Sequence, residues 1–279
     1  MKHLILIVGA LVSFAMGCDE INPPYEKSGS GGPVDTTGYG QHVLLEEFTG
    51  HTCRNCPVGH KVADQLRTLY GEKVVTMAIH AGAFAIPEGE YPDDFRTSAG
   101  DALNTLFKVS SYPAGVVNRS PVSGQYVQSS VAWASLVDTL TKGQSPFKLT
   151  LTPTYNGASK SLALAVRVQT RSTYTSTKPV AMMWYLVEDS VVAPQLNFNT
   201  RVPNYVHRDV LREAPMGVYG KPFFSSSTVP ANTSKDTTLN YSFASVPYVP
   251  EKCKAIVVMA LQDPEYRVLQ VSEVHVVKE

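Results

Sequence analysis

The sequence predicts an α/β domain followed by an all-β domain, and three observations carry this prediction. The apolar, strand-like run 43–48 is followed by a helical pattern over 56–69. A second apolar run, 74–79, completes the order of a β-α-β unit, whose strands are expected to be buried and parallel. After Gly143 the convincing helical patterns end and alternating, strand-like segments follow.

The composition fits a globular protein of one large or two ordinary domains, because 43% of its 279 residues are hydrophobic and 17% are charged. Lys+Arg and Asp+Glu are equal at 24 each. No basic field exists to attract nucleic acid, and we expect no nucleic-acid partner.

The chain begins with the pattern of an export signal. The apolar run 4–16 is shorter than the roughly 20 residues that span a bilayer, and small residues stand at 15 and 17, directly before Cys18. This resembles a bacterial lipoprotein signal, in which Cys18 becomes the lipid-bearing N-terminus. The same small residues also suit an ordinary signal peptidase, which would release a soluble protein. We predict a signal peptide over 1–17 and a lipidated, Gly/Ser/Pro-rich flexible tether over 18–41.

Each further element follows from its pattern. In the first half, Gly71 is expected to end the first helix, and more elements are expected at 94–109 (helix), 114–118 (strand) and 129–140 (helix). In the second half, turn signals such as Asn156-Gly157 separate strand-like segments. Those segments predict an immunoglobulin-like β-sandwich, with strands at 149–152, 162–171, 180–188, 237–243, 255–262 and 268–277. The Pro-rich stretch 193–230 shows no readable pattern.

Cys53 and Cys56 are the first candidates for chemistry. Their position at a strand-to-helix junction places Cys53 at or near a helix N-terminus, where unpaired N–H groups and the helix dipole favour a thiolate. Arg54 and His51 are expected to stabilise that thiolate further. A thiolate beside a second thiol can exchange disulfides.

The order β-α-β, helix, proline, β-β-α with this cysteine pair resembles the thioredoxin fold over residues 42–143. Three positions carry the resemblance: the Cys53–Cys56 pair, Glu47 six residues earlier, and Tyr112-Pro113 in the place of a cis-proline. The resemblance implies that Cys53 is the exposed attacking thiol and Cys56 the buried resolving thiol.

The same resemblance implies roles for three other residues. Glu47 would be a buried carboxyl with a raised pKa that relays a proton to or from Cys56. Its neighbour Glu46 should point to the opposite face of the strand and be solvated. Pro113, if cis, would leave the Tyr112 backbone available to pair with a substrate chain.

A closer likeness covers nearly the whole chain. The lipoprotein-type start and the segments 46–57, 78–82 and 204–212 are together similar to the twenty-eight-kilodalton outer-membrane-protein family of Gram-negative bacteria. The resemblance implies an envelope lipoprotein with a thioredoxin-like domain over 42–143 and a β-rich domain over 144–279. Adhesin or receptor roles are proposed for this family.

Other interpretations of the cysteine pair remain open. It could be a permanent disulfide that staples a loop, or Cys53, Cys56, His60 and His80 could ligate a metal ion. A single Cys-x-x-Cys without a second pair is weak evidence for a metal, and Pro57 after Cys56 rules out the haem-attachment pattern. We therefore expect neither a metal nor a cofactor.

Three residues of the second half receive structural interpretations. Cys253 is expected to be a partly buried apolar residue, His207 a hydrogen-bonded structural histidine, and Trp184 a core residue, with alternation sending only one of Trp184 and Tyr185 inward.

The sequence thus supports two hypotheses for a lipid-anchored outer-membrane protein of the cell envelope. The first is thiol–disulfide exchange with envelope proteins, with Cys53 as nucleophile, Cys56 resolving, Glu47 as proton relay and Tyr112-Pro113 shaping the substrate groove. The second is a non-enzymatic adhesin or receptor that uses the first domain as a scaffold and the β-sandwich to bind a surface or host ligand.

Overall fold

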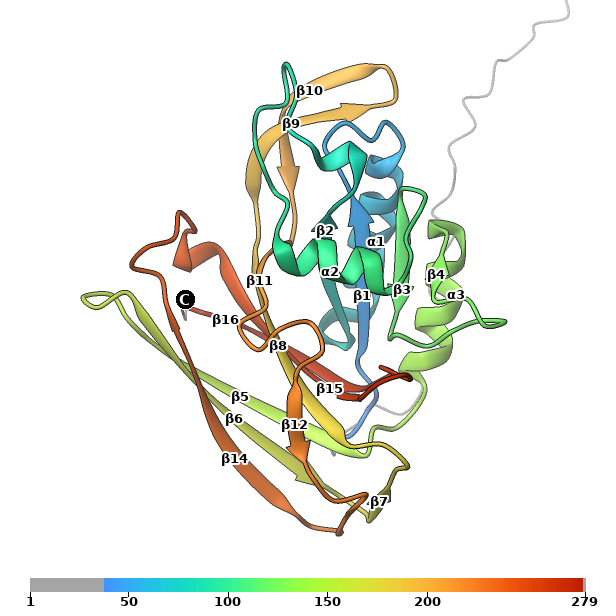
Figure 1. The fold of residues 1–279 in the computed structure, drawn as a ribbon, viewed down its shortest axis with the longest axis vertical. Helices are drawn as coiled ribbons and strands as arrows, with labels where there is room; N and C mark the ends of the chain where they lie inside the picture. Colours follow the sequence, from blue (N-terminus) through green and yellow to red (C-terminus); the bar gives the residue numbers. More distant parts are fainter. Residues whose placement is uncertain (1–37, 278–279) are drawn as a thin grey trace, which may run out of the picture. The chain divides into compact units, whose positions relative to one another are not determined.

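The computed structural model describes residues 38–277, which are mostly β, with sixteen strands and three α-helices (Figure 1). The predicted signal peptide (1–17), Cys18 and most of the predicted tether (18–41) lie outside these residues. No helix between residues 38 and 277 is long and apolar enough to cross a bilayer.

The predicted β-α-β unit is present. β1 (Val43–Thr49) and β2 (Val74–His80) pair in parallel along their whole length. α1 (Cys56–Tyr70) joins them and ends, as predicted, at Gly71, whose φ of +58° suits a residue without a side chain. The remaining elements of this half are β3 (Ala114–Val117), which is antiparallel to β1, β4 (Val127–Gln128) and α3 (Ser130–Thr141), which packs against α1.

The helix predicted over 94–109 is shorter, because α2 spans only Ser98–Leu106. Thr97 caps its first turn by accepting a hydrogen bond from the Gly100 N–H at 2.9 Å. Before it, the Asp94 carboxylate binds the backbone N–H and the guanidinium of Arg96, an arrangement that competes with helix formation. Local side-chain bonds therefore set the start of this helix.

One sheet joins the two halves of the chain. Its main strand order is β16-β15-β8-β11-β2-β1-β3-β4. It therefore includes strands from both sides of the predicted domain boundary between residues 143 and 144. The strands of the second half are β8 (Val180–Glu188), β11 (Val210–Glu213), β15 (Cys253–Leu261) and β16 (Val268–His275). The division into domains stays a prediction.

β8 is buried along its whole length because both of its faces are covered. Met183 and Tyr185 enter a core shared with β1, β2 and α2, whereas Met182 and Trp184 enter a second core. Strand alternation alone explains this division. The prediction for Trp184 is confirmed, but Tyr185 is buried as well, contrary to the expectation of one inward side chain.

A three-stranded antiparallel sheet contributes the other side of the second core, to which its Leu162 and Leu164 belong together with Trp184 and Val257 of the large sheet. The predicted strands of this layer are confirmed as β5 (Phe147–Asn156), β6 (Ser161–Thr170) and β14 (Ser234–Ser242). β5 and β14 run longer than expected, and β6 has the expected length. The all-β half thus has two packed layers.

The Pro-rich stretch without a readable pattern folds mainly into a hairpin of β9 (Val191–Asn197) and β10 (Thr200–His207), which pair only with each other. Short strands complete the fold: β12 (Lys221–Phe224) on β8, and β7 (Tyr174–Thr175) paired with β13 (Thr228–Val229).

Glu46 is buried, and the expectation that it would be solvated is wrong. Both faces of β1 are covered, so the residue needs a partner inside the protein. The Arg119 guanidinium supplies it with two hydrogen bonds of 2.6 and 2.9 Å, and also donates to the Tyr185 hydroxyl at 2.9 Å. A buried ion pair thus ties β1 to β8.

Candidate functional site

The Cys53–Cys56 pair lies at the strand-to-helix junction, as predicted. The two sulfurs are joined in a disulfide, with Cα atoms 5.4 Å apart. Asn55 precedes the first helical residue, and Pro57 occupies the first turn, where its missing N–H has no helical partner. The disulfide therefore lies at the N-terminal end of α1.

Both cysteines are buried: Cys53 is 2% exposed and Cys56 is fully inside. The expectation of an exposed Cys53 is wrong. The β9–β10 hairpin lies against the cysteine loop, where its Leu196 and Phe198 N–H groups donate to the His51 and Arg54 carbonyl oxygens, each at 2.8 Å. In Figure 1 the hairpin lies beside the end of β1.

Two neighbours were expected to stabilise a Cys53 thiolate, Arg54 and His51. The Arg54 guanidinium donates to the Asn199 side chain at 2.6 Å. The His51 ring lies 3.2 Å from the Ile86 carbonyl oxygen and stacks on Tyr91, and its pKa is lowered, chiefly by burial. A neutral imidazole offers no positive charge to a thiolate, so the expectation for His51 is wrong.

Glu47 lies on β1 under the first turns of α1 and is 4% exposed. Burial, with the negative charges of Asp64 and Asp209 as smaller causes, raises the pKa of this carboxyl well above its ordinary value, as expected. A Cβ at Gly59, one turn after Cys56, would lie 2.7 Å from Glu47 Oε1. The glycine therefore lets the carboxyl approach the helix closely.

The Tyr112–Pro113 peptide bond is cis, as the resemblance implied. Pro113 lies on the same side of α1 as Glu47, since a Cβ at Gly59 would also lie 2.9 Å from Pro113 Cβ. The Tyr112 hydroxyl donates to the Asn104 side chain at 2.6 Å. Glu47 and Pro113 are thus brought together beside one turn of α1.

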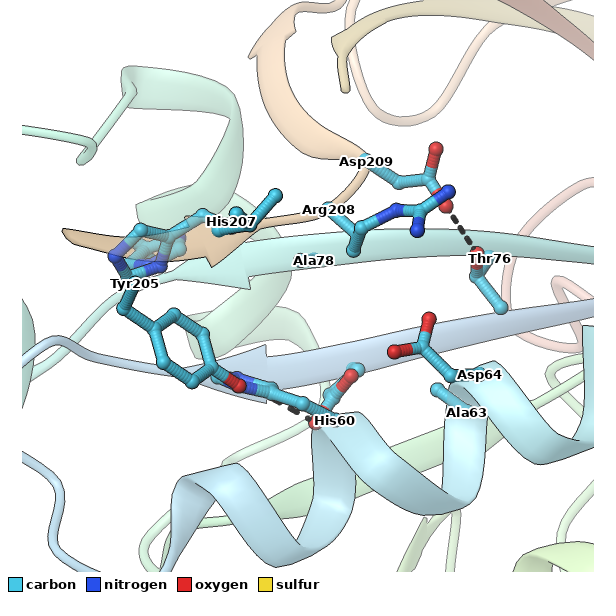
Figure 2. A pocket seen from close by; sticks show the side chains of 12 residues that line it. His60, Ala63, Asp64, Thr76, Ala78, Tyr205, His207, Arg208 and Asp209 are labelled. Atoms are coloured by element: carbon cyan, nitrogen blue, oxygen red, sulfur yellow. Dashed lines mark hydrogen bonds and ion pairs between the residues drawn. The ribbon is translucent and has the colours of Figure 1, made fainter. Parts of the chain in front are cut away.

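A cavity of about 30 Å³ opens beside Glu47, with room for a water molecule but not for an organic cofactor (Figure 2). Its walls come from α1, β1, β2 and the end of the hairpin. The residues that line it are Glu47, His60, Ala63, Asp64, Thr76, Ala78, His80, Tyr205, Val206, His207, Arg208 and Asp209.

His60 connects Glu47 with the hairpin. Its Nε2 lies 2.8 Å from Thr49 Oγ1 and 3.8 Å from Glu47 Oε1. Its Nδ1 lies 2.7 Å from the hydroxyl of Tyr205, which points toward His60 in Figure 2. Burial lowers the His60 pKa to about 3 and raises that of Tyr205, so both are neutral at neutral pH. A neutral imidazole donates at one nitrogen and accepts at the other, as a proton relay requires.

His80 and His207 form an aromatic group with Phe95, with ring centroids 5.0 to 5.4 Å apart. Burial lowers the pKa of His80 well below its ordinary value and that of His207 to about 4. The ring nitrogens of His80 have no hydrogen-bond partner. His207 is structural in its packing, and the backbone carbonyls of Ala193 and Pro194 oppose part of the effect of burial on its pKa.

The metal interpretation required free thiolates at Cys53 and Cys56 together with His60 and His80. The two sulfurs are bonded to each other instead. Within residues 38–277, no three His, Cys, Asp or Glu side chains are arranged to hold a metal ion. Cys253 is a free, fully buried thiol whose pKa burial raises to about 12, and the interpretation as an apolar core residue is confirmed.

Sequence reasoning did not assign a role at this site to Tyr205, Asp64 or Gln195. Asp64 lies on α1, whereas Tyr205 and Gln195 lie on the hairpin, each 145 residues along the chain from its partner, His60 or Gly50. The run 204–212, singled out only through its family likeness, was the one signal that pointed to this region.

Two of the solved structures that match this chain come from bacteria. HBP35 of Porphyromonas gingivalis matches with a TM-score of 0.65 at 14% identity, over 85% of this chain and 76% of that chain. A protein from Agrobacterium tumefaciens matches with a TM-score of 0.56 at 9% identity, over 86% of this chain and 96% of that one. Identities this low show a shared fold alone. No curated protein sequence matches this chain.

The class of protein follows from a family model. The model described as outer membrane protein Omp28 matches residues 100–279, which is more than half of the chain. A domain of the Omp28 outer membrane lipoprotein from Porphyromonas gingivalis also matches, at 16% identity, over 47% of this chain and 88% of that one, with a TM-score of 0.32.

This chain belongs to the Omp28 family of outer membrane proteins. Family membership places it in the outer membrane of the cell envelope, as expected. The matched range begins after Cys53, Cys56 and Glu47, so family membership carries no statement about their chemistry.

Proposed function

We propose that this envelope lipoprotein performs thiol–disulfide exchange through Cys53 and Cys56. One observation carries the proposal: a disulfide at the N-terminus of α1 has a buried carboxyl of raised pKa, Glu47, beside the next turn of the same helix. A proton donor at this depth is useful to a leaving thiolate, whereas a disulfide that only staples a loop has no need of one.

The exchange proceeds in two balanced steps. A substrate thiolate attacks Cys53 Sγ, which forms a mixed disulfide and breaks the Cys53–Cys56 bond. Cys56 leaves as a thiolate and receives a proton from Glu47. A second substrate thiolate then attacks the substrate sulfur of the mixed disulfide and releases the Cys53 thiolate, so that two electrons pass from the substrate to the pair. The reverse sequence reduces a substrate disulfide.

His60 supports the return of the proton. Once Glu47 is ionised, it must recover a proton from solvent although it is buried. The contacts of His60 with Thr49 and Tyr205 extend from Glu47 along the cavity, which also reaches the exposed side chain of Asp64. We assign His60 and the cavity to this proton route.

The finer architecture belongs to the same proposal. We infer a thioredoxin-like domain over 42–143, supported by the β-α-β unit, the cis-Pro113 and the final helix α3. We infer an immunoglobulin-like sandwich over 144–279, supported by the two packed layers. Lipidation at Cys18 is proposed from the signal pattern alone.

An insulin-reduction assay with a dithiol donor tests the proposal. Wild type should accelerate insulin precipitation, and Cys53→Ser should abolish the acceleration because no mixed disulfide can form. Cys253→Ala is the matched control, since this thiol is buried far from exchange chemistry, and it should keep full activity. Equal activity of wild type and Cys53→Ser would overturn the enzymatic proposal.

A second candidate function is a binding lipoprotein, and the burial of Cys53 under the hairpin favours it. In that case the disulfide is permanent and the β-sandwich binds an envelope or host-surface ligand. Ligand binding that Cys53→Ser leaves unchanged, together with no exchange activity in wild type, would select this function.

A further inference from the structure

The β9–β10 hairpin lies on the cysteine loop in the way that an added strand binds. The N–H groups of Leu196 and Phe198, two residues apart, donate to the carbonyl oxygens of His51 and Arg54 at 2.8 Å. Main-chain bonds from alternate residues are how an extended polypeptide is recognised at an exposed backbone edge. The hairpin thus occupies the backbone acceptors that an incoming chain would use next to Cys53.

Two side chains of the hairpin reinforce this contact. Gln195 is fully buried, and its Nε2 lies 3.2 Å from the Cys53 carbonyl oxygen and 3.3 Å from that of Gly50. Asn199, at the exposed turn, accepts a hydrogen bond of 2.6 Å from the Arg54 guanidinium. Both contacts are made to the segment 50–56, which contains the disulfide. We call Gln195 and Asn199 the latch residues, because their hydrogen bonds hold the hairpin on this segment.

The hairpin is built as a separate piece. β9 and β10 pair with each other and with no other strand of the described residues. Ser190, just before β9, and Asp209, just after β10, both have positive φ values, of 56° and 48°. Non-glycine residues adopt this region at a cost, and such strained positions concentrate at switch segments. Asp209 is itself held by Arg67 and Lys254, which gives the hairpin a fixed base.

We propose that the β9–β10 hairpin is an autoinhibitory strap, which must lift from the Cys53–Cys56 loop before a polypeptide substrate can reach Cys53. The inference rests on the proposed exchange function. It adds that the resting protein is closed, and that the substrate is an extended polypeptide segment that takes the place of Leu196 and Phe198 on the loop. Gln195 and Asn199 are positioning residues that hold the closed state.

The experiment measures how fast the Cys53–Cys56 disulfide is reduced in the full-length protein. Wild type, Gln195→Ala and Asn199→Ala are exposed to a small phosphine or to reduced thioredoxin, and newly formed thiols are counted by alkylation and mass spectrometry. Asn204→Ala is the control, because this exposed residue lies on the same hairpin away from the loop.

Loss of either latch should raise the rate of reduction by thioredoxin about tenfold, because a locally opened state becomes more populated. The Asn204→Ala variant should match wild type. Equal rates in wild type and both latch variants would overturn the strap. A disulfide that becomes more reducible in a chain without insulin activity would support the strap and reject the exchange function. Insulin activity that is the same in wild type and in both latch variants would support the exchange function and reject the strap.

Hydrogen exchange on the wild-type protein gives a test that needs no variant to fold. The amides of Leu196 and Phe198 should exchange much faster than those of β8, since a strap opens without global unfolding. Protection of both amides equal to that of β8 would contradict the proposal.

Discussion

Glu47 is a buried carboxyl that reduces the stability of the fold when it ionises, and it is the proton donor of the proposed exchange. Its pKa is raised, so the folded protein favours the protonated form. Such a group contributes stability below its unfolded pKa near 4.5, and this contribution is lost as pH rises through the higher folded value. Ionisation of this buried carboxyl therefore lowers the stability of the fold, and a group with such a shifted pKa is a candidate for the proposed proton transfer.

We predict that Glu47→Gln raises the free energy of unfolding by about 1–3 kcal/mol at pH 8 and changes it little at pH 4, because an amide carries no charge to desolvate. Chemical denaturation at the two pH values measures this. The exposed Glu72→Gln is the matched control and should show no pH-dependent gain. A gain of the same size at pH 4 and pH 8 would show that ionisation is not the cause.

Glu46, the residue before Glu47, is also buried, but it pairs with a positively charged side chain. Its partner Arg119 is fully buried, and the pair has side chains with 0% exposure on both sides. Replacing one partner leaves the other charge unpaired inside the protein, which costs far more than losing an exposed pair.

We therefore predict that Glu46→Gln lowers the free energy of unfolding by about 3–5 kcal/mol, as for other broken buried pairs. Glu265→Gln, which removes a half-exposed pair with Arg267 at 3.8 Å, should cost under about 1 kcal/mol. Urea denaturation of both variants checks this, and equal losses would contradict the buried pair's importance.

At the scale of elements, the β9–β10 hairpin packs the neutral ring of His207 against His80 of β2. The ring of His207 faces His80, Phe95 and Tyr205, with His51 and Arg212 as the charged or chargeable neighbours that further oppose its protonation. The carbonyls of Ala193 and Pro194 act in the other direction. Because the folded pKa is about 4 and the unfolded value is 6.5, the folded state binds fewer protons between these values.

Stability from His207 is therefore present above about pH 6.5 and is lost as the pH falls to about 4. We predict that wild type loses roughly 3 kcal/mol more between pH 7.5 and pH 4 than His207→Phe, which keeps an aromatic ring without a titrating nitrogen. Denaturation curves at both pH values measure the difference. Parallel losses in the two proteins would show that this histidine does not titrate on unfolding.

At the scale of the molecule, the two predicted domains share structure that neither could complete alone. β2 of the first half contacts β11 of the second, and one core contains Leu44 and Met77 together with Tyr185 and Val258. Arg119, which binds Glu46 in the first half, also donates a hydrogen bond to the Tyr185 hydroxyl in the second half. A core made jointly favours one cooperative unit.

We predict that a fragment of residues 38–143 does not fold cooperatively by itself, since removing residues 144–279 exposes its share of that core. Circular dichroism and proton NMR of the fragment, compared with the full chain, test this. A sigmoidal unfolding transition and dispersed amide signals from the fragment would show an independent domain.

Much of the secondary structure could be predicted because it depends on local order in the chain. Apolar runs identified β1, β2 and β8 to within a residue, and the spacing of Cys53 and Cys56 identified the junction with α1. The hairpin escaped prediction because its strands contain prolines, alternate weakly and pair only with each other. The burial of Glu46 escaped because its partner, Arg119, is 73 residues away.

By itself the sequence determined the β-α-β unit and the place of the cysteine pair, because these follow from periodicity and short spacings, whereas Glu47 was indicated only by the resemblance to the thioredoxin fold. Only the tertiary structure decided that Cys53 is covered, that His51 is neutral and that His60 meets Tyr205 across 145 residues. Exposure and charge depend on which distant segment packs against a group, and no local pattern encodes that contact.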